Sequence, residues 1–476
     1  MNTKLLKQKI LDLAIRGKLT QQLKSDGTAA DLLKEIADAK SALSQPKGKK
    51  SRDLGQIIPL DKNEAPFEIP ANWEWVRLGN VCKVFGRIGF RGYTKKDLVE
   101  KGEGAISLSP SNMDEMKLNF DRCTYISWFK YEESPEIMIN KGDIIVVKTG
   151  SSYGKTSIVQ DLPEKTTLNP QLMVLKQINC NRNYLCYFLN SAYFRKVFEE
   201  LVNGTAIPTF SQEKFSSKEF PLPPLAEQQR IVEKIQEAFA EIDSIENNKE
   251  LLKTHIKQAR QKILDLAIHG KLVPQNKNDE PASVLLERIT RDNPHYEKLA
   301  DAPFEIPDSW EWVKLGDICK LQSGSTIPQS QECDEGTMMY IKVSDMNLPE
   351  NLYEIKKSQR YVNQWKECQI INANSIIFPK RGGAILTNKK RIVREPVLTD
   401  LNIMGITPIA CFDYIYWWFM NIDLGLLNNG SNIPQLNNKD IAPLLLPLPP
   451  LAEQKRIVDK IEEIFASLDE ISLHLV

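Results

Sequence analysis

The chain has 476 residues, of which 42% are hydrophobic and 26% are charged, and its 62 lysines and arginines balance 62 aspartates and glutamates. This composition is typical of a soluble protein with more than one hydrophobic core, and no apolar run is long enough to cross a membrane. The first residues predict a helix and not a signal peptide, and the eight cysteines are scattered without a CxxC pair. We therefore expect a cytoplasmic protein without a disulfide framework or a zinc site.

In chain order, the predicted elements form two globular domains that alternate with helices. The expected boundaries are part of a helix at 1–20, a short helix and basic linker at 21–65, a first domain at 66–223, a long helix at 224–273, a short helix and linker at 274–302, a second domain at 303–449 and a helix at 450–476. Inside these segments we expect short helices at 28–43 and 282–291, strands at 142–148 and 374–378, and helices at 183–202 and 414–427.

The two halves of the chain repeat one another. Residues 262–272 restate residues 9–19, residues 303–313 restate 66–76, and residues 447–458 restate 221–232. Long-period self-similarity of this kind predicts two copies of one scaffold, each holding a different insert. The last residue aligns with Glu250 and the first with Thr254, so the N- and C-terminal helices are expected to form the split second copy of the central helix.

The central segment has the apolar spacing of a coiled coil. Its seam has alternating four- and three-residue steps and one polar position, Lys249, which favours a coiled coil over an amphipathic helix on a globular core. About 45 residues would extend roughly 70 Å, longer than a small domain, and an antiparallel partner is expected. The seam residues are Ile231, Ile235, Ala238, Ile242, Ile245, Leu252, Ile256, Ala259, Ile263 and Leu266, with Leu6, Ile10, Leu13, Ile457, Ile461, Ile464, Leu468, Ile471 and Leu475 on the terminal helices.

Three paired motifs carry a family resemblance: the Pro-Leu-Pro-Pro-Leu-Ala-Glu-Gln helix entries, the Trp-Glu-Trp-Val segments and the Asn-Gly…Ile-Pro turns. With their circular order, they resemble the specificity subunit of a Type I restriction-modification system over essentially the whole chain. The resemblance implies an α/β (α+β) fold with two target-recognition domains, joined by a long antiparallel two-helix coiled coil with pseudo-twofold, circularly arranged repeats. It also implies that each domain recognises one half of a bipartite DNA target, and that the helices set the spacing.

The same resemblance implies the partners. Two modification (adenine-N6 methyltransferase) subunits would dock on the helices, and restriction (translocase and endonuclease) subunits would join them on double-stranded DNA. The chain itself would be non-catalytic and hold no cofactor or metal, whereas S-adenosylmethionine, ATP and Mg²⁺ would bind the partner subunits. Zero net charge is unusual for a DNA-binding protein, and we expect the partners to supply much of the positive field.

Three loops in each insert combine basic, small polar and glycine residues, which suit base edges and phosphates. In the first insert the predicted DNA-binding residues are Arg87, Arg91, Tyr93, Lys95, Lys96, Ser109, Ser111, Asn112, Lys148, Ser151, Ser152, Tyr153 and Lys155. In the second insert they are Gln322, Ser323, Thr326, Lys342, Ser344, Asn347, Lys380 and Arg381. For any single residue, a solvated loop or structural turn is the competing interpretation.

Catalytic motifs are not found. The glycine-rich segment 150–156 is one residue short of a phosphate-binding loop, and no Asn-Pro-Pro-Tyr or Asp-Pro-Pro-Tyr methyltransferase motif occurs. The four histidines lie on or near the predicted helical scaffold, which leaves the inserts without a His-based nucleophilic site. Two alternatives stay open, a self-contained enzyme with unrecognised motifs and a structural adaptor that does not bind DNA.

Overall fold

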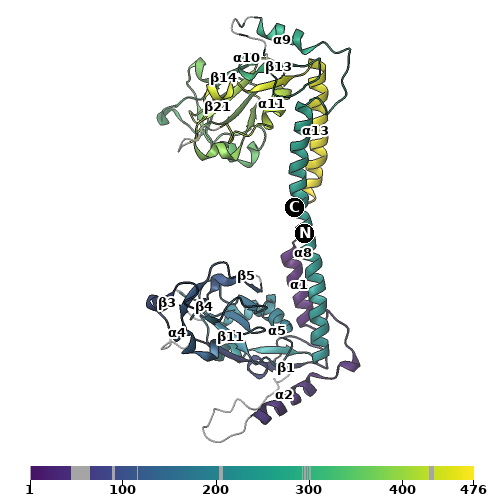
Figure 1. Ribbon diagram of the computed structural model, residues 1–476, viewed down its shortest axis with the longest axis vertical. Helices are drawn as coiled ribbons and strands as arrows, with labels where there is room; N and C mark the ends of the chain where they lie inside the picture. The colour runs from purple at the N-terminus through teal and green to yellow at the C-terminus, as the bar shows by residue number, and fades with distance from the viewer. Residues whose placement is uncertain are drawn as a thin grey trace. The chain divides into compact units, whose positions relative to one another are not determined.

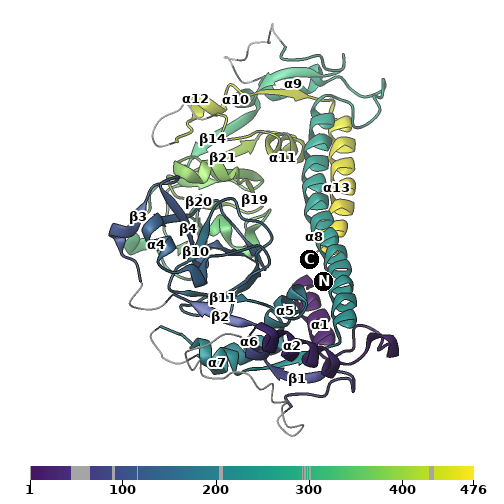
Figure 2. The same ribbon diagram turned by 60° about the horizontal axis from the view of Figure 1, so that its bottom comes forward.

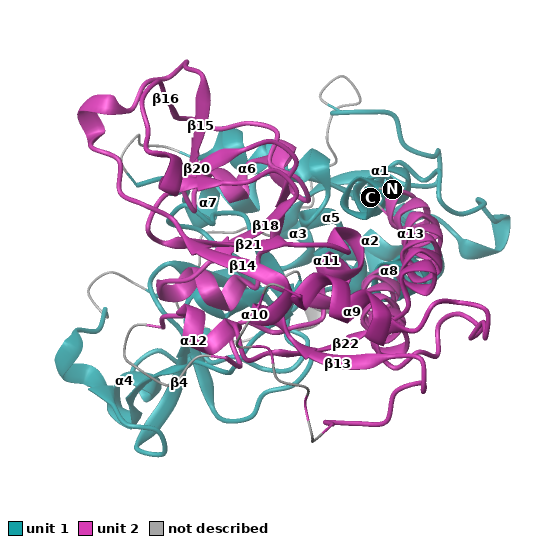
Figure 3. Ribbon diagram, turned by 90° about the horizontal axis from the view of Figure 1, so that it is seen from above, with its two compact units in different colours: residues 1–248 teal, residues 249–476 magenta. Residues whose placement is uncertain are grey.

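The computed structural model describes residues 2–43, 65–87, 92–114, 116–202, 207–291, 293, 296, 299, 302–427 and 434–475. The chain divides into two units, residues 1–248 and 249–476, and the long helix α8 (Leu225–Ile268) contributes to both (Figure 3). Each unit contains helices and sheets, as the expected α/β (α+β) class requires. Among the described residues, no helix is both long and apolar enough to span a bilayer.

The described residues of unit 1 form two four-stranded sheets and two short ribbons. The sheets have the strand orders β2-β11-β8-β9 and β10-β4-β7-β3, and the ribbons are β1-β12 and β5-β6. The strands are β1 (Glu74–Arg77), β2 (Lys83–Gly86), β3 (Leu98–Val99), β4 (Gly104–Leu108), β5 (Met113–Asp114), β6 (Lys117–Leu118), β7 (Thr124–Ser127), β8 (Ile144–Val147), β9 (Thr156–Ile158), β10 (Thr166–Leu168), β11 (Leu172–Lys176) and β12 (Glu219–Leu222). The helices are α1 (Thr3–Ile15), α2 (Ala29–Leu43), α3 (Leu78–Val81), α4 (Trp128–Glu132), α5 (Arg182–Leu189), α6 (Ala192–Leu201) and α7 (Gln212–Ser216).

Unit 2 repeats this plan. Its sheets have the orders β14-β21-β18-β19 and β16-β15-β20-β17, and its ribbon is β13-β22. The strands are β13 (Glu311–Lys314), β14 (Cys319–Ser323), β15 (Met338–Ile341), β16 (Tyr361–Val362), β17 (Ile370–Ile371), β18 (Ser375–Pro379), β19 (Arg391–Val393), β20 (Val397–Thr399), β21 (Ile403–Pro408) and β22 (Leu445–Leu448). The helices are α9 (Ala282–Thr290), α10 (Leu315–Ile318), α11 (Phe412–Met420), α12 (Asn438–Ile441) and α13 (Leu451–Leu473).

The two units share strand pairing even where their sequences diverge. The parallel pair β4 and β10 in unit 1 corresponds to the parallel pair β15 and β20 in unit 2, within otherwise antiparallel sheets. The ribbons pair the repeated motifs with each other: Trp75 lies opposite Pro221, and Trp312 lies opposite Pro447. Repeated segments separated by well over a hundred residues are therefore neighbours at the same point of each unit.

In unit 1, α1 packs antiparallel against the first part of α8 (Figure 1). Thr3 donates a hydrogen bond to Glu246, and Lys7 forms an ion pair of 2.6 Å with Asp243. Apolar residues of α1 and α8 join those of the inner sheet in one buried core, and α5 and α6 contact α1 from the domain side (Figure 2). The globular part of unit 1 is therefore packed directly against the helix pair.

In unit 2, α13 packs against the second part of α8, also antiparallel. Arg260 pairs with Asp469 and stacks over the Phe465 ring, and α11 contacts α13 (Figures 1 and 2). α8 ends at Ile268, five residues before the expected 273, at a glycine turn: Gly270 has a φ of +65°, and Lys271 donates its N–H to the Leu266 carbonyl at 2.9 Å. The predicted long helix and its antiparallel partners are therefore present.

The seam of α8 is buried near its ends and open in the middle. Ile231, Ile235, Ile242 and Ile256 are buried, Ile263 is half-buried, and Ile457, Ile461 and Leu468 line the core of unit 2. Ile245 and Leu252 are 44% and 39% exposed. Their assignment to a subunit interface stays a prediction.

Two predicted helices differ in extent from the observed ones. The expected helix over 183–202 is two helices, α5 and α6. The Asn190 side-chain amide donates to the Cys186 carbonyl at the end of α5, and the Ser191 hydroxyl caps α6 by accepting from the Phe194 N–H. The expected helix over 414–427 is limited to α11, which ends at Met420 and is followed by turns. In the first case, polar side chains satisfy backbone groups that a continuous helix would have used.

Candidate nucleic-acid interface

In unit 1, the three predicted loops meet at one edge of the sheets. β2 and β8 both run antiparallel to β11, so their C-terminal ends lie on the same side, with Gly86 opposite Met173 and Val147 opposite Leu172. The third loop follows β4, whose last residue Leu108 pairs with Leu168 of β10. The short turn from Leu168 to Leu172 therefore links the ends of all three strands, and we refer to this region as the unit 1 edge.

Arg87 lies inside the unit 1 edge. Its side chain is 4% exposed, donates through Nε to the Leu168 carbonyl at 3.0 Å and lies over the Tyr93 ring at 5.3 Å. Burial lowers the pKa of Arg87. Tyr93 in turn shares a hydrogen bond of 2.9 Å with Ser107. These contacts join the loop after β2 to the second sheet, so Arg87 and Tyr93 shape the edge, and their DNA contact stays a prediction.

The loop after β8 presents accessible polar groups. Ser151 and Lys155 are exposed, while Lys148 is half-buried and burial lowers its pKa. The two glycines of this loop have φ values of +104° and +81°, which explains why glycine is used there. The loop connects antiparallel strands and is a hairpin, a geometry different from the strand-to-helix turn of a phosphate-binding loop.

Unit 2 forms the corresponding edge with different side chains. Lys380, at the end of β18, donates to the Ser323 hydroxyl at the end of β14 at 2.7 Å. Ser325 N–H donates to the Thr399 carbonyl at 2.8 Å, and the Asp400 N–H donates to the Ile341 carbonyl of β15 at 3.0 Å. The turn from Thr399 to Ile403 thus links three strand ends as the turn at 168–172 does in unit 1, and it defines the unit 2 edge.

The other predicted contacts differ in accessibility. Lys95, Lys96, Ser111, Thr326, Ser344, Asn347 and Arg381 are exposed, and Ser109, Ser152 and Tyr153 are half-buried. Several of the predicted side chains already bind within the chain. Asn112 donates to the Asn119 and Arg122 carbonyls, Gln322 to the Cys368 and Ile370 carbonyls, and Lys342 to Glu332. Ser109 and Ser111 share a hydrogen bond, and Asn347 accepts one from Lys389. Arg91 lies outside the described residues.

Each edge also contains residues that the sequence did not single out. Gln171 is exposed in the turn that links the strands of unit 1, and its backbone N–H donates to the Asn169 side-chain oxygen at 2.9 Å. In unit 2, Gln435 pairs with Arg381 in an isolated bridge, as Thr209 pairs with Thr149 in unit 1. Thr209 and Gln435 directly follow the two repeated Asn-Gly…Ile-Pro turns, so the repetition of these turns was the available signal.

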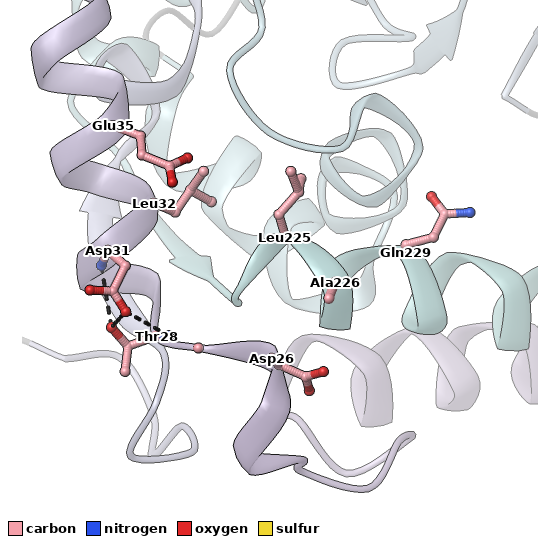
Figure 4. A pocket seen from close by; sticks show the side chains of 9 residues that line it. Asp26, Thr28, Asp31, Leu32, Glu35, Leu225, Ala226 and Gln229 are labelled. Carbon is pink, nitrogen blue, oxygen red and sulfur yellow. Dashed lines mark hydrogen bonds between the residues drawn. The ribbon is translucent and has the colours of Figure 1, made fainter.

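An acidic groove lies elsewhere in unit 1, between α2 and the first turn of α8 (Figure 4). Its volume is about 500 Å³, and its lining includes Asp26, Asp31, Glu35 and Leu225. Hydrogen bonds from Thr28 lower the pKa of Asp31, and the Arg230 side chain lowers that of Asp26. Three carboxylates are unsuited to a DNA phosphate, and we place the DNA interface at the unit edges instead.

Comparison with known proteins decides the family. Residues 70–254 and 307–473 match the Type I restriction modification DNA specificity domain. The chain belongs to this family. It is 26% identical to the Type I restriction enzyme EcoAI specificity subunit of Escherichia coli, over 98% of the chain and 90% of that protein. It is 25% identical to the EcoEI specificity subunit of Escherichia coli, over 99% and 90%.

Solved structures share the fold of this specificity subunit. The HsdS subunit from Thermoanaerobacter tengcongensis is 16% identical, with a TM-score of 0.53 over 87% of this chain and 94% of that one. A chain from work on complex assembly and conformational transition of the type I R-M system has a TM-score of 0.56 at 18% identity, over 86% and 94%. The family assigns sequence-specific DNA recognition to this subunit, which is not the enzyme and carries no cofactor itself.

Proposed function

We propose that the chain recognises a bipartite duplex target, with the unit 1 edge contacting one half and the unit 2 edge the other. The observation that supports this proposal is the recurrence of one backbone edge with different side chains, Gln171 in one unit and Asn402 at the corresponding turn in the other. A common backbone positions each edge in the same way, whereas different side chains favour different bases.

The long helix and its antiparallel partners would set the distance between the half-sites. α8 has 44 residues, which corresponds to about 66 Å of rigid rod. We propose that the same helices dock two methyltransferase subunits and that restriction subunits join this assembly in the cytoplasm. S-adenosylmethionine, ATP and Mg²⁺ would bind the partner chains, whose positive charge would compensate the neutral charge of this one.

The proposal is tested by co-expressing the chain with the methyltransferase encoded beside it in a methylation-free host and sequencing the DNA for N6-methyladenine. We expect one split motif that disappears when the chain is omitted. Methylation by this chain alone would indicate a self-contained enzyme. A complex of stable composition without salt-sensitive, sequence-selective DNA binding would favour the structural adaptor.

Two matched variants test the division between units. Gln171→Ala is expected to relax sequence selectivity in one half of the motif, and Asn402→Ala, at the corresponding turn, in the other half only. A glutamine or asparagine that contacts an adenine edge contributes about 1–3 kcal/mol of discrimination, so the relaxed positions should admit other bases at readily measured levels. Each variant is the control of the other, and relaxation in both halves by either variant would contradict the assignment.

A further inference from the structure

A buried carboxylate stands at the start of the long helix in each unit. Glu227, in the first turn of α8, is fully buried and accepts a hydrogen bond of 2.8 Å from the indole of Trp73. Glu453, in the first turn of α13, is 1% exposed and accepts one of 3.0 Å from Trp310. The paired motifs of the sequence thus bind each other, since the tryptophan opens the recognition domain and the glutamate opens the helix.

Each carboxylate also contacts a third segment, the loop that follows the antiparallel helix. In unit 1, Thr20 donates to Glu227 at 3.4 Å. In unit 2, Gln275 donates to Glu453 at 2.5 Å. One buried charge therefore connects the recognition domain to both helices of the pair, and it does so in both units.

An ion pair one turn further along reinforces this connection. In unit 1, Arg230 binds Asp26 through two hydrogen bonds of 2.7 and 2.6 Å. In unit 2, Arg456 binds Asp279 at 2.7 Å. The unit 1 pair is bidentate, and such a pair fixes orientation as well as distance, whereas the single bond in unit 2 fixes the distance between loop and helix.

The domain side of the connection is packed without free space. In unit 1, Trp73 and the Pro70 ring lie against Gly17, and a Cβ atom added to this glycine would be 2.3 Å from Pro70 Cγ. In unit 2, Trp310 and the Pro307 ring lie against Gly270, and the corresponding distance to Pro307 Cγ is 2.5 Å. Both glycines have a φ of +65°. A buried charge that is fully hydrogen-bonded in so tight a site costs free energy when any partner moves, and it therefore resists rotation.

We propose that Glu227 and Glu453 are positioning residues that fix the angle at which each recognition domain leaves the helix pair, and so determine how strictly the complex selects the gap between half-sites. This inference rests on the proposed bipartite recognition. A domain of this size is roughly 30 Å across, so a tilt of about 7° at the joint moves its far edge by about 3.5 Å. That displacement equals the rise of about one base pair.

The experiment measures methylation by the complete complex of this chain with its methyltransferase, on duplexes that carry the identified motif with the native gap or a gap one base pair shorter or longer. The readout is the ratio of rates on the native and altered gaps. Trp73→Phe and Glu227→Ala should lower this ratio about tenfold or more, which corresponds to about 1.4 kcal/mol of lost discrimination. Glu227→Gln keeps an acceptor for the indole and should keep most of the ratio.

Trp75→Phe is the matched control. Trp75 is buried beside Trp73, but its indole N–H has no hydrogen-bond partner among the described residues. The Trp75→Phe variant should leave the ratio of rates on native and altered gaps unchanged. The variants Trp310→Phe and Trp312→Phe repeat the comparison in unit 2, where the Trp312 indole N–H also has no hydrogen-bond partner among the described residues. Equal loss of rate at all three gaps, or equal relaxation by Trp75→Phe, would overturn the proposal.

If a variant loses methylation activity altogether, the proposal can still be tested by a distance measurement on the purified full chain. Cysteine-independent spin labels at Lys101 in the domain and Glu237 on α8 report one distance within unit 1. Trp73→Phe should broaden the distribution of that distance, and Trp75→Phe should not. Equal widths would overturn the proposal, whereas a wild-type complex that methylates no split motif would instead contradict the bipartite function on which it rests.

Discussion

Lys390 provides a prediction whose size follows from the structure. Its side chain is 1% exposed and donates to the Asn388 side chain at 3.0 Å and to the Ile422 carbonyl at 2.5 Å, beside the Phe419 ring. These contacts tie the loop that begins at Arg381, part of the unit 2 edge, to the end of α11. Burial lowers the pKa of Lys390 from 10.5 to about 7, with Asp423 opposing the shift.

The direction in which the free energy of unfolding changes with pH follows from proton linkage. Between pH 7 and pH 10.5 the unfolded lysine holds a proton that the folded one has lost, so the free energy of unfolding rises with pH in this range and is flat below it. Integrating from pH 7 to pH 8.5 gives about 1.6 kcal/mol of added stability from this group. The upper limit of pH 8.5 is below the usual pKa of tyrosine, and the titration of the cysteines, which begins near this pH, is common to the wild type and the variant and cancels in their difference.

The assay is urea unfolding of the wild type and Lys390→Met at pH 7.0, 7.75 and 8.5. The variant lacks the titrating amine, so its stability should not show this pH dependence, and the stability of the wild type relative to the variant should rise by about 1.6 kcal/mol across the series. Parallel profiles of the two proteins would refute the argument, since they would show that Lys390 does not release its proton on folding.

Three further predictions concern packing, backbone and charge. Ile235→Ala, at a fully buried seam position, should lower the free energy of unfolding by about 2–5 kcal/mol, and Leu252→Ala, at a position that is 39% exposed, by less than about 1 kcal/mol; urea unfolding that gives equal losses would contradict the observed seam. Gly17→Ala should cost clearly more than Gly102→Ala by thermal unfolding, because both glycines have positive φ but only Gly17 has atoms within 3 Å of the new Cβ. Lys155→Ala should reduce the slope of log affinity against log salt by about 1 in the assembled complex, while Lys101→Ala, before the opposite end of β4, should leave it unchanged. A slope that Lys101 alters as much as Lys155 would place the interface elsewhere.

Local patterns predicted much of the scaffold. The period of the seam defined α8 to within a few residues of its observed bounds, and the repeats identified two equivalent domains. β8 and β18 lie inside or within one residue of their predicted strands, Gly142–Lys148 and Asn374–Phe378. These features depend on residues close in sequence, whose spacing alone determines which face of a helix or strand is apolar.

The candidate site was predicted only in part. The sequence selected loops that do meet at one edge in each unit, but it could not separate accessible residues such as Lys155 and Arg381 from Arg87 and Asn112, which the fold uses internally. Gln171 was missed because an isolated glutamine in a turn has no local signature. Accessibility depends on which distant strand lies beside a loop, and a single sequence does not state that pairing.

The sequence by itself determined that this specificity subunit has two similar halves, a long amphipathic helix and two different inserts, because periodicity and repetition are properties of neighbouring residues. Only the tertiary structure decided what the repeated tryptophan and glutamate do. Trp73 and Glu227 are 154 positions apart, and the need to satisfy a buried carboxylate brings them within 2.8 Å. That requirement acts only once the core has formed, and so the connection between recognition domain and helix is visible in the fold and not in the chain.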